Sequence, residues 1–277
     1  MDIEKTFNIS ICSYNLFWEV MDNDFSKNSG QLVKKIGKDN LNELKSNILK
    51  NIFFIKNIYN PYFYCFQEAV SWTDITNLFE LSLYEYYVGK SGPEYILTVW
   101  KSHIFEKKFV FDGEFESGRP FTIFIFKDLR FNLHFILINI HASHNKDTFT
   151  SIFEPIQKIL SSVSIINNIQ IKNLDIKRII ICGDFNRDIS AQIINDSNIS
   201  NSLYKLKINS KEYYFKPFIS NNKTCCNLNG YAYNKNYDQV IDTFDKPLII
   251  HVLNKEKWYT SKSSDHVAVL AIVKNIL

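Results

Sequence analysis

Short apolar runs recur along the chain, and each of them predicts a β-strand. In the first run, Phe7, Ile9 and Ile11 alternate with polar or small residues, which is the pattern of a strand with one buried face. Later runs are rich in aromatic or β-branched residues and are bounded by polar segments, which also favours strands. We predict strands at 7–14, 62–66, 84–88, 95–101, 105–111, 121–126, 133–140, 179–182, 238–243, 248–253 and 267–273.

Two longer segments carry apolar residues at steps of three and four and predict amphipathic helices. The first covers about 31–58, and the second covers 149–166, where Pro155 must lie near the first turn or kink the helix. Shorter helices are predicted at 72–81 and 189–197. The segment 22–30 and the polar stretches that continue through Asn229 are predicted to be loops.

The order of these elements favours an α+β fold in which two stacked sheets are flanked by helices. The chain has 277 residues, with no internal repeat and no Pro-, Gly- or Ser-rich linker. We therefore expect one domain over 1–277.

Composition and charge exclude little. A formal net charge of +3 allows an anionic substrate but is low for a dedicated nucleic-acid binder. The N-terminal residues do not resemble a secretory signal, and no apolar stretch is long enough to span a membrane. The five cysteines are odd in number. We therefore expect reduced thiols and an intracellular location, in cytoplasm or nucleus.

The segment 178–187, RIIICGDFNR, is the centre of the candidate chemistry. Its isoleucines predict a fully buried strand, which Gly183 ends. Asp184 and Asn186 follow, and side chains at such strand ends can point into a cleft beyond the sheet. Gly, Asp and Asn are also the commonest turn residues, so this segment alone leaves both interpretations open.

Other predicted strands also have metal-binding or proton-transferring residues at or beside their ends. These residues are Asn15, Glu68, His141, Asp184, Asn186, Asp238, Asp265 and His266. Mg²⁺ prefers oxygen ligands, so Glu68 is the natural first ligand, with Asn15 and Asp265 near it. Histidines can orient a phosphate and supply a proton. The set indicates metal-assisted hydrolysis of a phosphate ester.

The same pieces, in their order along the chain, resemble the exonuclease–endonuclease–phosphatase superfamily, which has the fold of deoxyribonuclease I. They are SYN at 13–15, QE at 67–68, NIHAS at 139–143, GDFN at 183–186, YDQVI at 237–241 and SSDH at 263–266. The resemblance implies a four-layer α/β/β/α sandwich of two mostly antiparallel sheets, with the site at the top of the sheets. It also implies that Glu68 holds the metal, with Asn15 and Asp265 close by.

The remaining roles come from the same resemblance. His266 would contact the scissile phosphate and be paired by Asp238. Asp184 would orient or deprotonate the attacking water, and Asn186 would bind the phosphate. His141 would be a second phosphate contact or the general acid for the leaving oxygen.

The motifs are most similar to those of the deoxyribonuclease I and cytolethal-distending-toxin nuclease branch. By that resemblance, Arg119 and Arg187 would contact substrate phosphates. Apurinic-site endonucleases carry a Tyr and an Asn where this chain has His141, and inositol-polyphosphate 5-phosphatases carry a Trp and an Arg that 236–241 lacks. The long spacing before Glu68 predicts an insertion at about 20–45.

We therefore expect a divalent-metal-dependent phosphodiesterase acting on nucleic acid, most simply a DNA nuclease that uses Mg²⁺, with Mn²⁺ as the alternative ion. No obligate protein partner is evident in the sequence. A tyrosyl-DNA phosphodiesterase, a phosphoinositide phosphatase or a sphingomyelinase-type hydrolase on the same fold is the alternative. A non-catalytic binding module is the third hypothesis.

Overall fold

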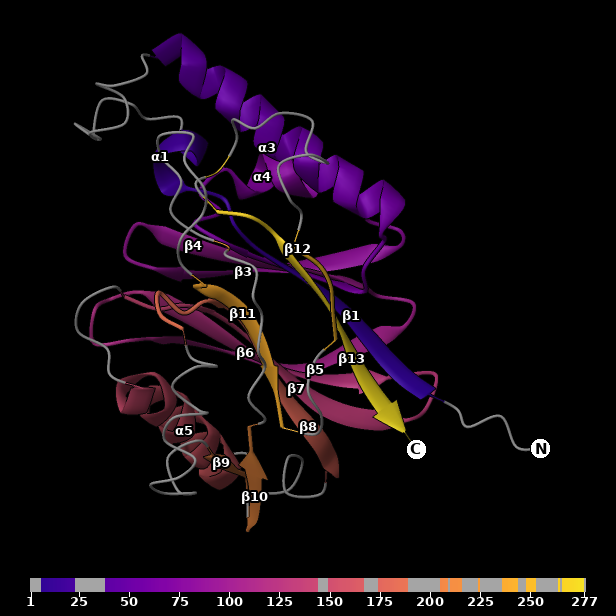
Figure 1. Cartoon of the computed structure of the whole chain (residues 1–277). Coiled ribbons are helices and arrows are strands. Elements are labelled where there is room, and N and C mark those ends of the chain that lie inside the picture. The colour runs from indigo at the N-terminus through magenta and orange to yellow at the C-terminus, as the bar shows by residue number, and fades with distance from the viewer. Residues whose placement is uncertain are drawn as a thin grey trace.

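The computed structural model places two large β-sheets face to face, with helices on their outer faces (Figure 1). It describes residues 6–22, 38–143, 149–166, 174–188, 205–208, 210–215, 224, 236–243, 248–252, 264 and 266–276. The layers follow the order helix, sheet, sheet, helix, so the predicted α+β sandwich is confirmed.

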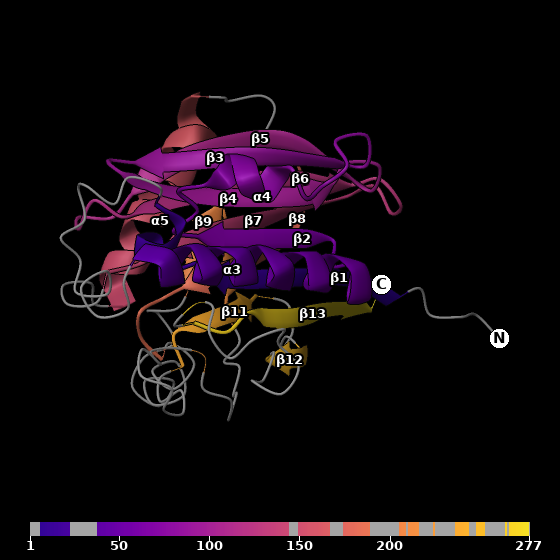
Figure 2. The same cartoon turned by 90° about the horizontal axis from the view of Figure 1, so that it is seen from above.

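The first sheet has six strands in the order β12-β13-β1-β2-β4-β3. Neighbours are antiparallel except β1 and β2, which are parallel. The helix α3 (Lys38–Ile58) lies between β1 and β2 in the chain and covers the outer face of the sheet (Figure 2). The strands are β1 (Thr6–Asn15), β2 (Phe63–Gln67), β3 (Tyr84–Ser91), β4 (Glu94–Lys101), β12 (Leu248–Val252) and β13 (Val269–Ile276).

The second sheet repeats this plan with five strands in the order β11-β8-β7-β6-β5. Only β7 and β8 are parallel among its described pairs, and α5 (Phe149–Ile166) lies between them in the chain. Each sheet therefore contains one strand–helix–strand unit of the kind that parallel pairing requires. The strands are β5 (Phe105–Glu114), β6 (Pro120–Asp128), β7 (Leu133–His141), β8 (Ile176–Asp184) and β11 (Asp238–Asp242).

Three apolar clusters among the described residues hold the layers together. The cluster between the sheets is strongly aromatic, and the ring of Phe63 lies 4.6 Å from that of Phe105 and 5.0 Å from that of Phe126. A second cluster packs the first sheet against α3, α1 (Trp18–Met21) and α4 (Trp72–Thr76). The third packs the second sheet against α5. No described helix is long and apolar enough to cross a membrane.

The structure corrects the sequence predictions in two places. The polar stretch before Asn229 contains two short strands, β9 (Lys205–Ile208) and β10 (Lys211–Tyr214), which pair with each other and place Leu206 and Tyr213 in the α5 cluster. The helix predicted at 72–81 ends at Thr76. Of the two alternatives predicted for Pro155, the first-turn position is excluded, because the residue lies inside α5.

Other predictions lie partly or wholly outside the described residues. These are the loop at 22–30 beyond position 22, the first part of the 31–58 helix, and the 189–197 helix. The predicted insertion at about 20–45 and the single domain over 1–277 stay predictions.

Candidate active site

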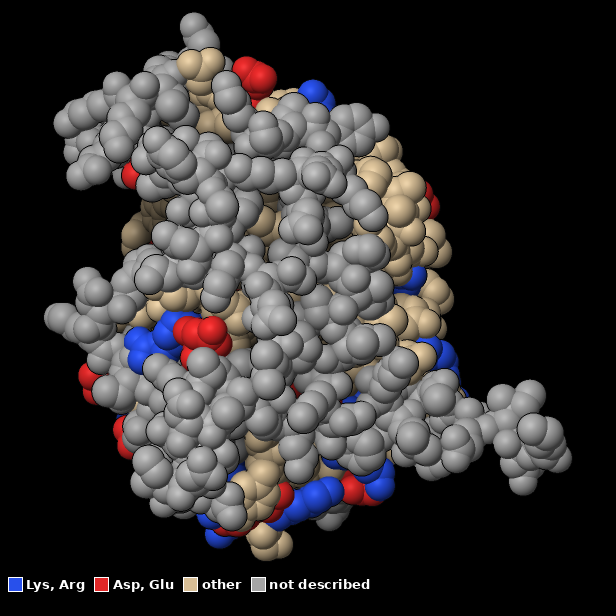
Figure 3. Space-filling view, in the orientation of Figure 1, with Lys and Arg blue, Asp and Glu red and all other residues tan. Residues whose placement is uncertain are grey.

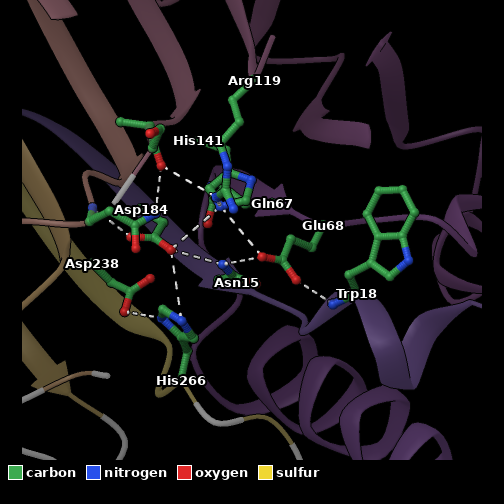
Figure 4. Close-up of polar contacts among 12 residues, drawn as sticks. Asn15, Trp18, Gln67, Glu68, Arg119, His141, Asp184, Asp238 and His266 are labelled. Atoms are coloured by element: carbon green, nitrogen blue, oxygen red, sulfur yellow. Dashed lines mark hydrogen bonds and ion pairs between the residues drawn. The ribbon is translucent and has the colours of Figure 1, made fainter. Parts of the chain in front are cut away.

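The candidate site lies where the parallel strand pairs of both sheets end. Asn15 and His141 are the last residues of β1 and β7, Asp184 is the last residue of β8, and Glu68 follows β2 directly. The carboxyl ends of neighbouring parallel strands meet at one sheet edge, which is where open α/β sheets hold their sites. The two face-to-face sheets bring these edges together (Figure 4).

Asp184 is the centre of the group. Its Oδ2 accepts a hydrogen bond of 2.9 Å from Nδ2 of Asn15, and lies 3.7 Å from Nε2 of both His141 and His266. Its Oδ1 accepts a bond of 2.8 Å from the backbone N–H of Asn186. Burial alone raises the pKa of Asp184, but the charges of the two histidines and these hydrogen bonds outweigh it and lower the pKa. Asp184 is therefore an ionised acceptor at neutral pH.

His266 is held by a second buried carboxylate. Its Nδ1 lies 2.7 Å from Oδ2 of Asp238, the first residue of β11, and this leaves Nε2 directed toward Asp184. Burial raises the pKa of Asp238 to about 6, against the opposing effect of His266. The hydroxyl of Ser264 fixes the segment, because it accepts from the backbone N–H of His266 and donates to the carbonyl of Asn15.

His141 is held in the same way by Glu94, a residue that the sequence did not predict. Nδ1 of His141 lies 3.0 Å from Oε2 of Glu94, and Nε2 faces the guanidinium Nη1 of Arg119. Burial favours the neutral form of Glu94, but the hydrogen bond and charge of His141, together with Arg119, lower its pKa below the ordinary value. The site thus contains two histidines that are each oriented through Nδ1 by a carboxylate.

Glu68 lies beside His141 and Asn15. Its Oε1 accepts a bond of 3.2 Å from Nδ2 of Asn15 and lies 3.4 Å from Nε2 of His141. Its Oε2 accepts from the backbone N–H of Trp18. The backbone at Glu68 has φ of 55°, a left-handed conformation that is costly for a residue with a side chain and is often found at functional sites.

Asn15 bridges the carboxylates of Glu68 and Asp184 through its amide nitrogen. Its Oδ1 accepts a bond of 3.0 Å from the backbone N–H of Phe17, which fixes the orientation of the amide. Asn15 is thus next to Glu68, as predicted, and its nitrogen faces the carboxylate.

Asn186 and Arg187 lie near the end of β7. Nδ2 of Asn186 donates a bond of 2.5 Å to the carbonyl of Ala142, and Nη2 of Arg187 lies 3.5 Å from the carbonyl of Ser143. Arg119 also donates to the carbonyl of Ala142 at 3.3 Å. Both predicted arginines therefore reach the chain that follows His141. Asp265 lies outside the described residues.

Gly183 is what allows Asp184 to sit against β7. Its φ is 143°, and a Cβ added at this position would lie 2.0 Å from the carbonyl oxygen of Ile140. No residue with a side chain fits that distance.

Three of the buried titratable groups lie close enough to suggest a cation. Ligand atoms of Asp184, Asp238 and His266 lie within 4.8 Å of one another. However, Nδ1 of His266 points at Asp238, so these three side chains are better arranged to share a proton than to bind a cation. The carboxylate of Glu68, whose Oε1 lies next to the amide of Asn15, is a hard oxygen donor and fits a divalent metal such as Mg²⁺, which proteins usually hold with one or two carboxylates.

No model of a known protein family matches the sequence, and no curated protein sequence matches it. Solved structures do match. An endonuclease/exonuclease/phosphatase family protein from Bacteroides thetaiotaomicron has a TM-score of 0.63 at 16% identity, over 98% of both chains. This chain has the endonuclease/exonuclease/phosphatase fold.

Other proteins with this fold are similar to a comparable degree. ANGEL2, a 2′,3′-cyclic phosphatase solved with adenosine-2′,3′-vanadate, has a TM-score of 0.65 at 15% identity, over 98% of this chain and 97% of its own. A mannosyl-6-phosphatase from Bacteroides thetaiotaomicron has a TM-score of 0.60 at 15% identity, over 96% and 99%. These likenesses establish the fold, and the deoxyribonuclease I and toxin branch stays a prediction.

Proposed function

We propose that this chain is a divalent-metal-dependent phosphodiesterase that cleaves nucleic acid, with DNA as its main substrate. The observation that carries the proposal is the convergence of two carboxylate-held histidines on Asp184, with Glu68 beside His141. Such a set provides a base, two oriented imidazoles and an oxygen ligand at one point, which is what phosphate-ester hydrolysis requires.

Glu68 is the proposed metal ligand, and Asp265 is proposed to lie near enough to contribute. Asn15, predicted as a ligand, is proposed to hold the carboxylates of Glu68 and Asp184 in place, because its nitrogen faces both. A bound Mg²⁺ or Mn²⁺ would offset the negative charge that builds on the phosphoryl oxygens.

Asp184 is the proposed base. It is ionised at neutral pH because its pKa is lowered, and its Oδ2 lies between the two histidines. A water molecule that donates a hydrogen bond to this oxygen would be oriented and deprotonated for attack on phosphorus. Nδ2 of Asn186 carries a second hydrogen, which is proposed to bind the phosphate.

The two histidines and the arginines are proposed to contact the substrate. His266, fixed by Asp238, contacts the scissile phosphate through Nε2. His141, fixed by Glu94, contacts a phosphate oxygen or donates a proton to the leaving oxygen. Arg119 and Arg187 bind the non-bridging or neighbouring phosphate oxygens, a geometry for which guanidinium groups are well suited.

Nucleic acid is favoured as substrate over a free phosphate ester because two arginines, Arg119 and Arg187, reach the chain that follows His141 and could bind more than one phosphate. On the face shown in Figure 3, several of the described Lys and Arg residues lie next to Asp and Glu. With two arginines at the site, we expect local phosphate contacts and a moderate dependence of affinity on salt.

A phosphomonoesterase or cyclic phosphodiesterase is the second candidate. It is favoured by the fold likeness to ANGEL2 and to the mannosyl-6-phosphatase. Both candidates use the same base and the same metal ligand, so the substrate distinguishes them.

A substrate panel tests the proposal. Purified protein with Mg²⁺ is offered single- and double-stranded DNA, RNA, a 2′,3′-cyclic nucleotide, a tyrosyl-linked DNA end, a sugar phosphate, a phosphoinositide and sphingomyelin, each with and without EDTA. We expect EDTA-sensitive cleavage of DNA at the highest kcat/KM. If a phosphomonoester or a lipid is hydrolysed fastest, the nuclease assignment is wrong. If every substrate stays intact, the catalytic assignment is wrong as well.

A further inference from the structure

Three partly exposed aromatic side chains lie on the outer face of the first sheet, outside the catalytic cluster. They are Trp72, Tyr86 and Tyr95. Tyr86 is 37% exposed, and its ring lies 6.1 Å from that of Trp72 with an angle of 35° between the planes. Nζ of Lys90 lies 5.0 Å from the ring centre of Tyr95. We call these four residues the aromatic strip.

The sheet register places the strip on one face. Lys90 is opposite Tyr95 and Tyr86 is opposite Val99 across the β3–β4 pair. Val99 packs in the cluster beneath α3 and α4, so its side chain faces outward. Because alternate side chains of a strand share a face, those two and four positions from Val99 on β4 and from Tyr86 on β3 also face outward. Trp72 reaches Tyr86 from the start of α4.

A backbone hydrogen bond joins the strip to the residue that follows the candidate metal ligand. The backbone N–H of Ala69, the residue after Glu68, donates a bond of 2.9 Å to the carbonyl of Tyr95. Trp72 is four residues after Glu68 and opens the helix that follows. Glu94, which holds His141, is the neighbour of Tyr95. Trp72 and Tyr95 of the strip are therefore within a few residues, along the chain, of the proposed catalytic groups.

Core packing explains only part of this arrangement. Leu97 and Val99, on the same face, are buried, whereas Tyr86 is exposed and Tyr95 and Trp72 are half-buried. Partly exposed aromatic rings with a lysine beside one of them are the usual platform for unpaired bases, since every base has a flat face and the lysine attracts the phosphate backbone. In a duplex the bases are stacked inside and cannot reach such rings.

Resting on the proposed function, we infer that the aromatic strip binds unpaired bases next to the scissile phosphate. The substrate class is therefore single-stranded nucleic acid, or a duplex end or flap with unpaired nucleotides. DNA and RNA share this chemistry, because stacking uses only the base.

Binding to the His266→Ala variant tests the inference without cleavage. Fluorescence anisotropy is measured with labelled oligo(dT), oligo(rU) and a blunt DNA duplex, in Mg²⁺. We expect a lower Kd for the single strands than for the duplex. Adding Tyr86→Ser, Tyr95→Ser or Trp72→Ser should raise the single-strand Kd by about 5- to 150-fold, the range measured for stacked bases. The ratio of the oligo(dT) and oligo(rU) values distinguishes DNA from RNA.

Two further variants control for folding. Tyr214→Ser removes an aromatic residue that is 43% exposed on β10, away from the strip, and should leave Kd unchanged. Trp72→Phe keeps a ring for stacking and should retain most of the affinity for single strands. If Trp72→Ser weakened binding only through a packing defect, it would lower Tm, and Trp72→Phe would not restore the affinity. Equal Kd values for single strands and duplex, or strip variants with unchanged Kd, would overturn the inference.

Activity on a small ester separates this inference from the proposed function. With bis(p-nitrophenyl) phosphate as substrate, the wild-type protein should show metal-dependent turnover, and Tyr86→Ser should keep it. If the wild type hydrolyses neither the ester nor any nucleic acid, the proposed function fails whatever the strip binds. If the ester is hydrolysed but strip variants bind oligonucleotides normally, the strip inference alone fails.

Discussion

The side chains of Gln67 and Asn139 form a hydrogen bond of 2.8 Å across the interface between the two sheets. Gln67 precedes Glu68, and Asn139 lies two residues before His141. Both side chains are fully buried, and Asn139 also donates to Oγ1 of Thr98 at 3.1 Å. These two hydrogen bonds cross between the sheets directly behind the site and help to fix how far the Glu68 half is from the His141 half.

We predict that Gln67→Leu lowers kcat by up to about 10²-fold, because small displacements between reacting groups are that costly. It should also destabilise the protein by about 1–3 kcal/mol, since Asn139 loses a buried partner. Steady-state kinetics and urea unfolding measure the two effects.

The matched control for this prediction is Gln157→Leu. Gln157 on α5 bonds to the carbonyl and N–H of Lys207 on β9, at 2.9 and 2.6 Å, away from the site. Gln157→Leu should lower the free energy of unfolding while kcat stays unchanged. A Gln67→Leu enzyme with normal kcat would show that the bridge does not position the site.

Glu68→Gln tests the metal assignment. The amide keeps the shape of the side chain and removes its charge, so the Mg²⁺ concentration for half-maximal activity should rise by about tenfold or more, in line with the loss of a carboxylate ligand. KM for nucleic acid should change much less. Metal titrations of both enzymes at saturating substrate measure this, and an unchanged titration would remove Glu68 as a ligand.

Asp238 is expected to set the acid limit of activity. Burial raises its pKa to about 6, so the protonated fraction grows as the pH falls through that value, and the anion that holds Nδ1 of His266 is lost. Asp184 stays ionised in this range because its pKa is lowered. We predict that kcat/KM decreases below about pH 6.

The pH–rate profile of Asp238→Asn is the comparison. Its residual activity should be low and should lack the acid limb, since the titrating group is gone. Persistence of the same limb in this variant would assign it to another group.

Gly183→Ala tests the close approach of β8 to β7. The new methyl group would meet the carbonyl of Ile140, in a conformation of positive φ, and we expect destabilisation of about 1–3 kcal/mol or more. The control is Gly92→Ala, which also has positive φ, at 53°, but has nothing within 4 Å of the added group. If both variants have the same Tm, the contact with Ile140 does not constrain the site.

The sequence predicts much of this site because burying an unpaired polar or charged side chain costs free energy. Such a residue directly after a buried strand therefore indicates a functional role. That rule finds Glu68, His141 and Asp184 at the ends of strands. It misses Glu94, which begins a strand. Because β4 is antiparallel to β2, the first residue of β4 lies at the same sheet edge as Glu68, and only the pairing of strands reveals this.

Other features depend on information that local pattern does not contain. The bond between Gln67 and Asn139 requires the two sheets to be stacked in one register. The β9–β10 hairpin has an alternating pattern, in Leu206 and Ile208, that is short and sits in a polar stretch rich in asparagine. Its apolar residues are fixed by packing against α5, a contact between distant parts of the chain.

We propose that His266, held by Asp238, acts in a metal-dependent phosphodiesterase site. Nicking of supercoiled plasmid with Mg²⁺ tests it most directly, for wild type, His266→Ala and the control His103→Ala, whose imidazole is exposed and lies near the carbonyl of Leu83. We expect EDTA-sensitive nicking by wild type and His103→Ala, and a loss of at least about 10²-fold in His266→Ala. Equal nicking by all three proteins would contradict it.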